Sequence, residues 1–162
     1  MEHREAAMLL AQNGARSSCF ALVRPVFEAY MRGEWAIACA TEEELNRFVD
    51  GKYDPKLDTI VKKLGQLPHF ADGIFDTIRS SGWESLCDYA HGGIRQVSRW
   101  ITADGIEPQH TDEEVMEVLH FNNLYGLLAC VGIAGIAGLE GDIYLQKADE
   151  LKIAYQSDQS DI

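Results

Sequence analysis

The chain has 162 residues, of which 46% are hydrophobic and 25% are charged, as in an ordinary soluble domain. These fractions exclude a disordered tail, a collagen-like rod and a disulfide-rich toxin, and the length suits a single domain over residues 1–162. The formal net charge is -12, so the surface repels nucleic-acid phosphates unless its few cations are clustered.

The first two expected helices occupy the N-terminal quarter of the chain. One covers residues 2–12 and ends at Asn13-Gly14. A longer second helix runs from about residue 17 to 40, and Ser17 or Ser18 can cap its start. Pro25 lies inside this helix and predicts a kink, because proline lacks the backbone N–H that the helix requires.

Helical signals continue to the end of the chain. Thr41-Glu-Glu-Glu44 and Thr111-Asp-Glu-Glu114 are capping boxes, in which the threonine hydroxyl and the last carboxylate each accept from the other's backbone N–H. Further helices are expected over residues 42–50, 55–66 (with Asp54-Pro55 as cap and first position), 73–81, 83–101 (divided at Gly92-Gly93), 112–140 and 142–155. The predicted fold class is therefore all-α, a single bundle of six to eight helices with a core over about 15–155 and a frayed tail at 156–162.

The sequence also predicts a cytoplasmic location. The N-terminus MEHREAAMLL places charges among its first residues and lacks the features of a signal peptide. The four cysteines have no CxxC spacing, which favours free thiols in a reducing compartment. The most apolar stretch, Leu124 to Leu139, is shorter than the roughly 20 residues that a membrane span needs. We expect no contact with a membrane.

Three charged residues on the second helix are the first candidate site. Arg24, Glu28 and Arg32 follow one another at intervals of four in a helix that is otherwise almost entirely apolar. Because four residues advance the helix by roughly 40° beyond a full turn, the three side chains form one narrow stripe. Either the stripe is exposed and holds two ordinary ion pairs, or it lines a cleft where charged groups must be paired or bind something.

The second candidate site surrounds His91. If the helix continues through Gly92-Gly93, five polar side chains fall within an arc of roughly 80°: Glu84, Asp88, His91, Arg95 and Arg99. His91 is then the natural acid or base, and Arg95 and Arg99 can hold a phosphate or a carboxylate. Alternatively, His91 is an ordinary residue at a helix C-terminus and the arginines offset the acidic surface.

Small residues recur at intervals of three in Gly126, Ala129, Gly132, Gly135 and Gly138. Because each glycine costs a helix up to about 1 kcal/mol relative to alanine, the pattern predicts that another helix packs very closely here. That helix belongs either to the same chain or to a second subunit, and we expect a homodimer through residues 126–138 or a neighbouring face. No Walker-type loop or HExxH motif occurs, and neither a cofactor nor a metal is expected.

The segments RPVFEAYMRGEW and WESLCDYAHGGIRQVSRW resemble a group of bacterial helical proteins that pair an Arg-Pro-x-x-Glu helix with a later helix carrying a histidine. Through them, residues 15–140 distantly resemble the HEPN superfamily, helical bundles of toxin–antitoxin and phage-defence systems. The resemblance places a polar site at Arg24, Glu28 and His91. Metal-independent ribonucleases of that superfamily use an arginine followed four to six residues later by a histidine, and this sequence has no such pair.

Two functions are consistent with these patterns. In the first, the chain is a HEPN-like protein that binds or acts on RNA or a nucleotide. His91 is then the acid or base, Glu28 orients it, and Arg24, Arg95 and Arg99 hold phosphate. In the second, the chain is a non-catalytic antitoxin, immunity or scaffold subunit whose negative charge meets a basic protein partner.

Overall fold

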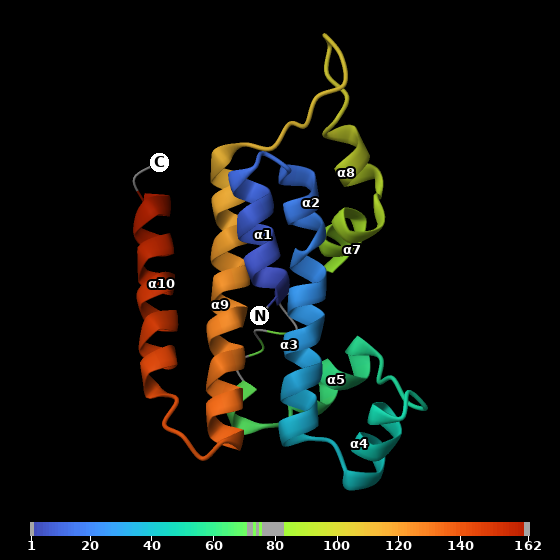
Figure 1. Cartoon of the computed structure of the whole chain (residues 1–162), viewed down its shortest axis with the longest axis vertical. Coiled ribbons are helices and arrows are strands. Elements are labelled where there is room, and N and C mark those ends of the chain that lie inside the picture. Colours follow the sequence, from blue (N-terminus) through green and yellow to red (C-terminus); the bar gives the residue numbers. More distant parts are fainter. Residues whose placement is uncertain (1, 71–72, 74, 76–82, 161–162) are drawn as a thin grey trace.

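The computed structural model describes residues 2–70, 73, 75 and 83–160. The all-α fold is confirmed (Figure 1). The helices follow in this order: α1 (Glu2–Gln12), α2 (Arg16–Ala21), α3 (Val23–Ala38), α4 (Glu42–Val49), α5 (Leu57–Leu64), the 3-10 helix η1 (Pro68–Phe70), α7 (Trp83–His91), α8 (Ile94–Ser98), α9 (Asp112–Ile136) and α10 (Asp142–Ser160). Most of the helix expected over residues 73–81 lies outside the described residues.

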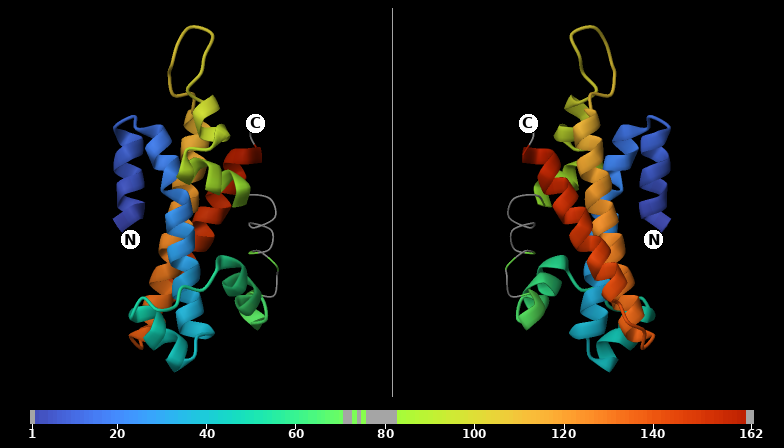
Figure 2. Two further views of the ribbon diagram at one scale, coloured as in Figure 1. Left: turned by 90° about the vertical axis from the view of Figure 1, so that its right-hand side faces the viewer. Right: turned by 90° about the vertical axis from the view of Figure 1, so that its left-hand side faces the viewer.

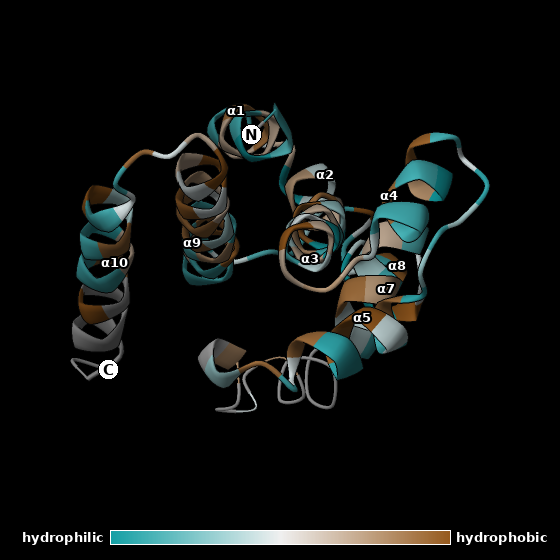
Figure 3. Ribbon diagram, turned by 90° about the horizontal axis from the view of Figure 1, so that it is seen from below, coloured by the Kyte–Doolittle hydropathy of each residue, from teal (hydrophilic) through white to brown (hydrophobic). Residues whose placement is uncertain are grey.

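Helices α3 and α9 lie side by side at the centre of the molecule and run in the same direction (Figure 1). Helices α1 and α2 pack together at one end, α5 and α7 contact α3, and α10 packs along α9 at the edge of the bundle (Figure 3). The connection between α8 and α9 extends beyond the helices at one end (Figure 2) and is pinned by an isolated antiparallel bridge between Ile101 and Ile106.

The predicted long second helix is present as α2 and α3, which lie nearly in line and are interrupted at Leu22 (Figure 1). Pro25 is the third residue of α3 and has no N–H to donate to the carbonyl of Ala21. The backbone tightens at this point, because the Leu22 N–H donates to the carbonyl oxygen of Cys19, three residues back, at 3.2 Å. The irregularity caused by the proline therefore falls within the turn that precedes it.

Two predicted helix starts are wrong. Helix α2 begins after Ala15 without a side-chain cap, and Ser17 and Ser18 lie inside it. Helix α5 begins after Lys56, two residues later than expected. Asp54 caps nothing there, because its carboxylate accepts a hydrogen bond from Arg32.

Both capping boxes are confirmed, and the one at Thr111 gives a testable stability effect. The Thr111 hydroxyl accepts from the backbone N–H of Glu114 at 3.2 Å, and the Glu114 carboxylate accepts from the Thr111 N–H at 2.9 Å. We expect Thr111→Ala to lower the free energy of unfolding by about 1 kcal/mol, measured by urea denaturation. Thr59→Ala, the same change at an exposed position inside α5, should leave the free energy of unfolding unchanged. Equal losses of stability in the two variants would contradict the contribution of the cap.

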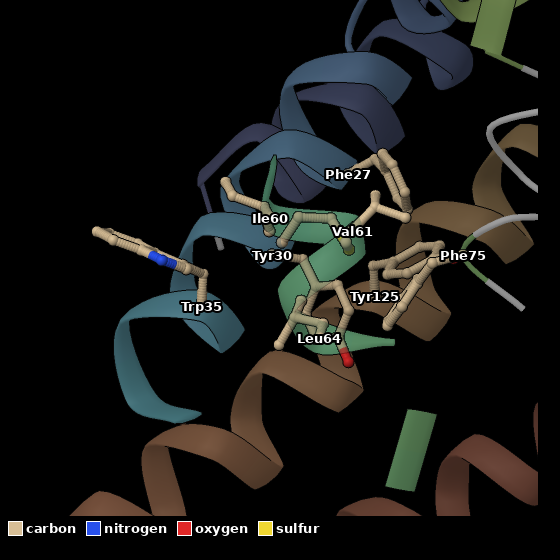
Figure 4. Packing of buried hydrophobic residues seen from close by; sticks show 9 residues of the cluster. Phe27, Tyr30, Trp35, Ile60, Val61, Leu64, Phe75 and Tyr125 are labelled. Atoms are coloured by element: carbon tan, nitrogen blue, oxygen red, sulfur yellow. The ribbon is translucent and has the colours of Figure 1, made fainter. Parts of the chain in front are cut away.

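The larger core cluster lies where α3, α5 and α9 meet. The rings of Tyr30 on α3 and Tyr125 on α9 are tilted against each other, with centroids 5.0 Å apart, and Ile60 and Leu64 of α5 are fully buried beside them (Figure 4). Trp35, also fully buried, joins this cluster to Phe48 and Tyr53 on the side of α4. This core holds α3 rigidly along its length, and α3 carries the first candidate site.

The small-residue pattern of α9 marks close packing at two of its positions. A Cβ atom at Gly126 would lie 2.7 Å from Cδ of Arg4, and one at Gly132 would lie 3.2 Å from Cδ1 of Ile37. At Gly135 a Cβ atom would meet nothing within 4 Å. Close packing within the chain therefore explains the first half of the pattern and leaves the second half facing open space.

Two further observations concern the C-terminal helices. Helix α10 continues to Ser160, five residues beyond the end predicted from the sequence. Helix α9 is long and apolar enough to cross a membrane, although core helices of soluble proteins have the same length and composition. Only 22% of its most apolar window is buried.

Candidate functional site

The polar stripe on α3 is present and forms one ion-pair chain. Arg24 Nε donates to Glu28 Oε1 at 2.7 Å, and Arg32 Nη1 donates to Glu28 Oε2 at 2.9 Å. The three side chains retain between 21% and 26% of their full exposure, so the stripe is neither a solvated surface strip nor part of the core. Each oxygen of the Glu28 carboxylate is thereby held by a different guanidinium.

Both ends of this chain reach other parts of the fold. Arg32 Nε donates to Asp54 Oδ1, at 3.2 Å, in the segment that precedes α5. At the other end, the Arg24 guanidinium carbon lies 4.9 Å from the ring centroid of Trp83, and its Nη1 contacts Nε2 of His91 at the end of α7. Arg24 is therefore fixed by a carboxylate, an aromatic face and an imidazole from two helices.

These side chains lie along a cleft of about 460 Å³ between α3 and the end of α7. Small apolar side chains form the remainder of its walls. The lining residues are Ala21, Arg24, Pro25, Glu28, Ala29, Arg32, Ala90 and His91. The cleft therefore brings together Arg24, Glu28 and His91, the three residues that the family resemblance placed in one site.

The electrostatics of the cleft follow from these contacts. Burial by itself raises the pKa of Glu28, but the hydrogen bonds and charges of Arg24 and Arg32 outweigh it and hold that pKa below its ordinary value. A guanidinium can only donate, so Nε2 of His91 is the acceptor in its contact with Arg24. The imidazole that fits this geometry is neutral, with its proton on Nδ1.

One predicted role within the cleft needs correction. Glu28 was expected to orient His91, but its two oxygens are taken up by Arg24 and Arg32, and Arg24 is the group in contact with the imidazole. Glu28 therefore positions Arg24, which in turn positions His91. The local i,i+4 spacing favours these ion pairs over a partner on another helix.

Arg95 and Arg99 do not line the cleft. Helix α7 ends at His91, because Gly92 adopts a φ of 67° that only glycine tolerates easily, and the predicted arc of five polar side chains is therefore not formed. Arg95 lies on α8, with Nε 3.7 Å from the carboxylate of Asp88. Arg99 is paired with Glu114 at 2.5 Å.

Two parts of the site were not predicted from the sequence. Asp54 was assigned to a helix cap, whereas its carboxylate accepts a hydrogen bond from Arg32, and Trp83, which was given no place in the site, lies under Arg24. Aspartate before proline is typical of helix starts, so no sequence signal distinguished the two roles. A tryptophan at the start of a helix likewise gives no sequence signal that it contacts an arginine.

Fold and site together define an all-α protein with a charged cleft between two helices. The chain belongs to DUF6988, a family of unknown function whose model matches residues 1–155. No curated protein and no solved structure matches it. The resemblance to the HEPN superfamily therefore stays a prediction.

Proposed function

We propose that the charged cleft binds a phosphate group of RNA or of a nucleotide, in a cytoplasmic HEPN-like protein of a bacterial defence or toxin–antitoxin system. The observation that carries this proposal is the position of Arg24, whose guanidinium is held in the cleft between Glu28 and His91. A guanidinium fixed in this way is pre-organised to donate to phosphate oxygens. The apolar walls formed by Ala21, Ala29 and Ala90 leave room beside it.

The same arrangement supports a metal-independent cleavage of RNA. A bound phosphate takes over the Nη1 donor of Arg24, which frees Nε2 of His91 to accept the proton of the neighbouring ribose 2′-hydroxyl. The 2′-oxygen attacks phosphorus, the bond to the 5′-oxygen breaks, and that oxygen takes a proton from water. The products are a 2′,3′-cyclic phosphate and a 5′-hydroxyl, and Arg24 stabilises the charge that develops on the phosphoryl oxygens.

The test is digestion of total tRNA by the purified chain in EDTA, together with a binding assay on the same RNA. We expect His91→Ala to lower the cleavage rate by about 100-fold or more while RNA still binds. Arg24→Ala should weaken binding itself. Arg95→Ala is the matched control, because this arginine pairs with carboxylates outside the cleft, and both activities should survive the change.

Absence of RNA binding by the unchanged protein would contradict the proposal. The alternative is then a non-catalytic subunit that binds a basic protein. Two observations favour that alternative: the net charge of -12, and the pairing of Arg99 with Glu114 and of Arg95 with Asp88, which removes two cations from a phosphate site. In that case we expect the chain to bind a cationic protein in a salt-sensitive manner, and His91→Ala should leave that binding unchanged.

A further inference from the structure

A second groove, apolar and of about 400 Å³, runs between α3 and α9. His3 and Arg4, near the N-terminus of α1, line one end of it. Small residues on both helices form part of its walls and allow close approach of another backbone. The small residues are Ala29, Gly33 and Ala36 on α3, and Gly126, Ala129 and Gly132 on α9.

Polar groups without partners line this groove. Tyr30 and Tyr125 are 8% and 4% exposed, and neither hydroxyl has a hydrogen-bond partner among the residues that the structure describes. Glu34 also lines the groove, has no ion pair within the described ranges, and has its pKa raised by burial. These groups are available to hydrogen-bond with a neighbour that covers the groove.

The rim of the groove is apolar and exposed. Ile37 on α3 and Ile133 and Ile136 on α9 are 49%, 59% and 70% exposed. They extend the apolar surface beyond the groove itself, along a central helix of whose most apolar window only 22% is buried. A continuous apolar face of this kind marks an interaction site rather than a solvated surface.

The charges along the groove are arranged for self-association. Arg4 lies against Gly126 at one end, with Nε bonded to Asn123 at 2.7 Å and without a described partner for its two Nη groups. Glu34 lies against Gly132 on the opposite wall. The two glycines are six residues apart, or about 9 Å along α9, and Ala129 is midway between them.

We propose that this groove is the interface of a homodimer, in which a second copy of the chain packs antiparallel, with the two-fold axis perpendicular to the groove and passing between α3 and α9 at the level of Ala129. A rotation of 180° about that axis places α3 of each copy opposite α9 of the other. It also places Arg4 over Glu34 of the second copy, twice, and seats the rim isoleucines of one copy on the small residues of the other. Such an interface is self-complementary, as two-fold symmetry requires.

The test is the oligomeric state in solution, measured by sedimentation over a wide range of protein concentration. We expect the unchanged protein to be a dimer. Glu34→Arg and Arg4→Glu should each weaken dimerisation at least tenfold, because each places like charges opposite each other, and the double variant should restore it. Glu107→Arg, the same charge change in the exposed loop before α9, should leave the dimer intact.

A variant that fills the groove tests the same interface without altering charge. A Cβ atom at Gly33 would meet nothing within 4 Å, so Gly33→Trp should preserve the fold and yield a monomer. Circular dichroism checks that its helix content is unchanged. A monomeric unchanged protein, a dimer insensitive to all of these changes, or a monomer that co-sediments with phosphatidylcholine vesicles through α9 would each overturn the proposal.

Discussion

Trp35→Ala should lower the free energy of unfolding by about 3–5 kcal/mol, the largest loss expected from any single change to the core. Trp35 is fully buried, and its ring lies 5.6 Å from that of Phe48 and 6.0 Å from that of Tyr53, measured between centroids. Truncation leaves a cavity where α3 meets α4 and the segment before α5. Because a domain of this size has a total stability of roughly 5–15 kcal/mol, the loss removes a large share of it.

The measurement is urea denaturation followed by far-ultraviolet circular dichroism, since tryptophan fluorescence changes with the substitution itself. Trp100→Ala is the matched control, because it makes the same change at a tryptophan that is 38% exposed. Trp100→Ala should lower the free energy of unfolding far less than Trp35→Ala does. Trp35→Phe should also cost less than the alanine change, because it retains a ring and removes an indole N–H that has no partner among the described residues. Similar losses in all three variants would show that Trp35 is not the anchor of this core.

The features that the sequence predicted well are local in the chain. The starts of α4 and α9 follow from four-residue capping boxes, and the Arg24–Glu28–Arg32 stripe follows from helical spacing alone. Each of these involves residues close enough in sequence for backbone geometry to decide which side chains meet. Local contacts of this kind form regardless of how distant parts of the chain pack.

The features that the sequence predicted poorly depend on contacts between distant segments. The contact between Arg24 and His91 spans 67 positions, and no spacing rule identifies it. Arg99 was placed on the His91 face on the assumption that the helix continues through Gly92. The positive φ of Gly92 instead ends the helix and directs the next turn toward Glu114. Similarly, the groove between α3 and α9 was anticipated only as a pattern of small residues, and the position of Glu34 inside it was not foreseen.

Glu28→Gln should lower the stability of the chain at neutral pH by about 1–3 kcal/mol, because the carboxylate accepts charge-assisted hydrogen bonds from both Arg24 and Arg32. The glutamine retains the shape but not the charge, so Arg24 loses the carboxylate of Glu28 while Arg32 keeps its ion pair with Asp54. Glu43→Gln, an exposed carboxylate in the first turn of α4, should change stability by no more than about 0.5 kcal/mol.

The pH dependence of this loss identifies its origin. Because the folded-state pKa of Glu28 is lowered from the ordinary value of 4.5, its carboxylate contributes fully above that value, and the contribution is lost as the pH falls through the folded-state pKa. The difference in stability between the unchanged protein and Glu28→Gln should therefore be constant near neutrality and shrink at acidic pH. A difference that persists undiminished in acid would mean that shape and packing, rather than the charge held between the two arginines, keep Arg24 in the cleft.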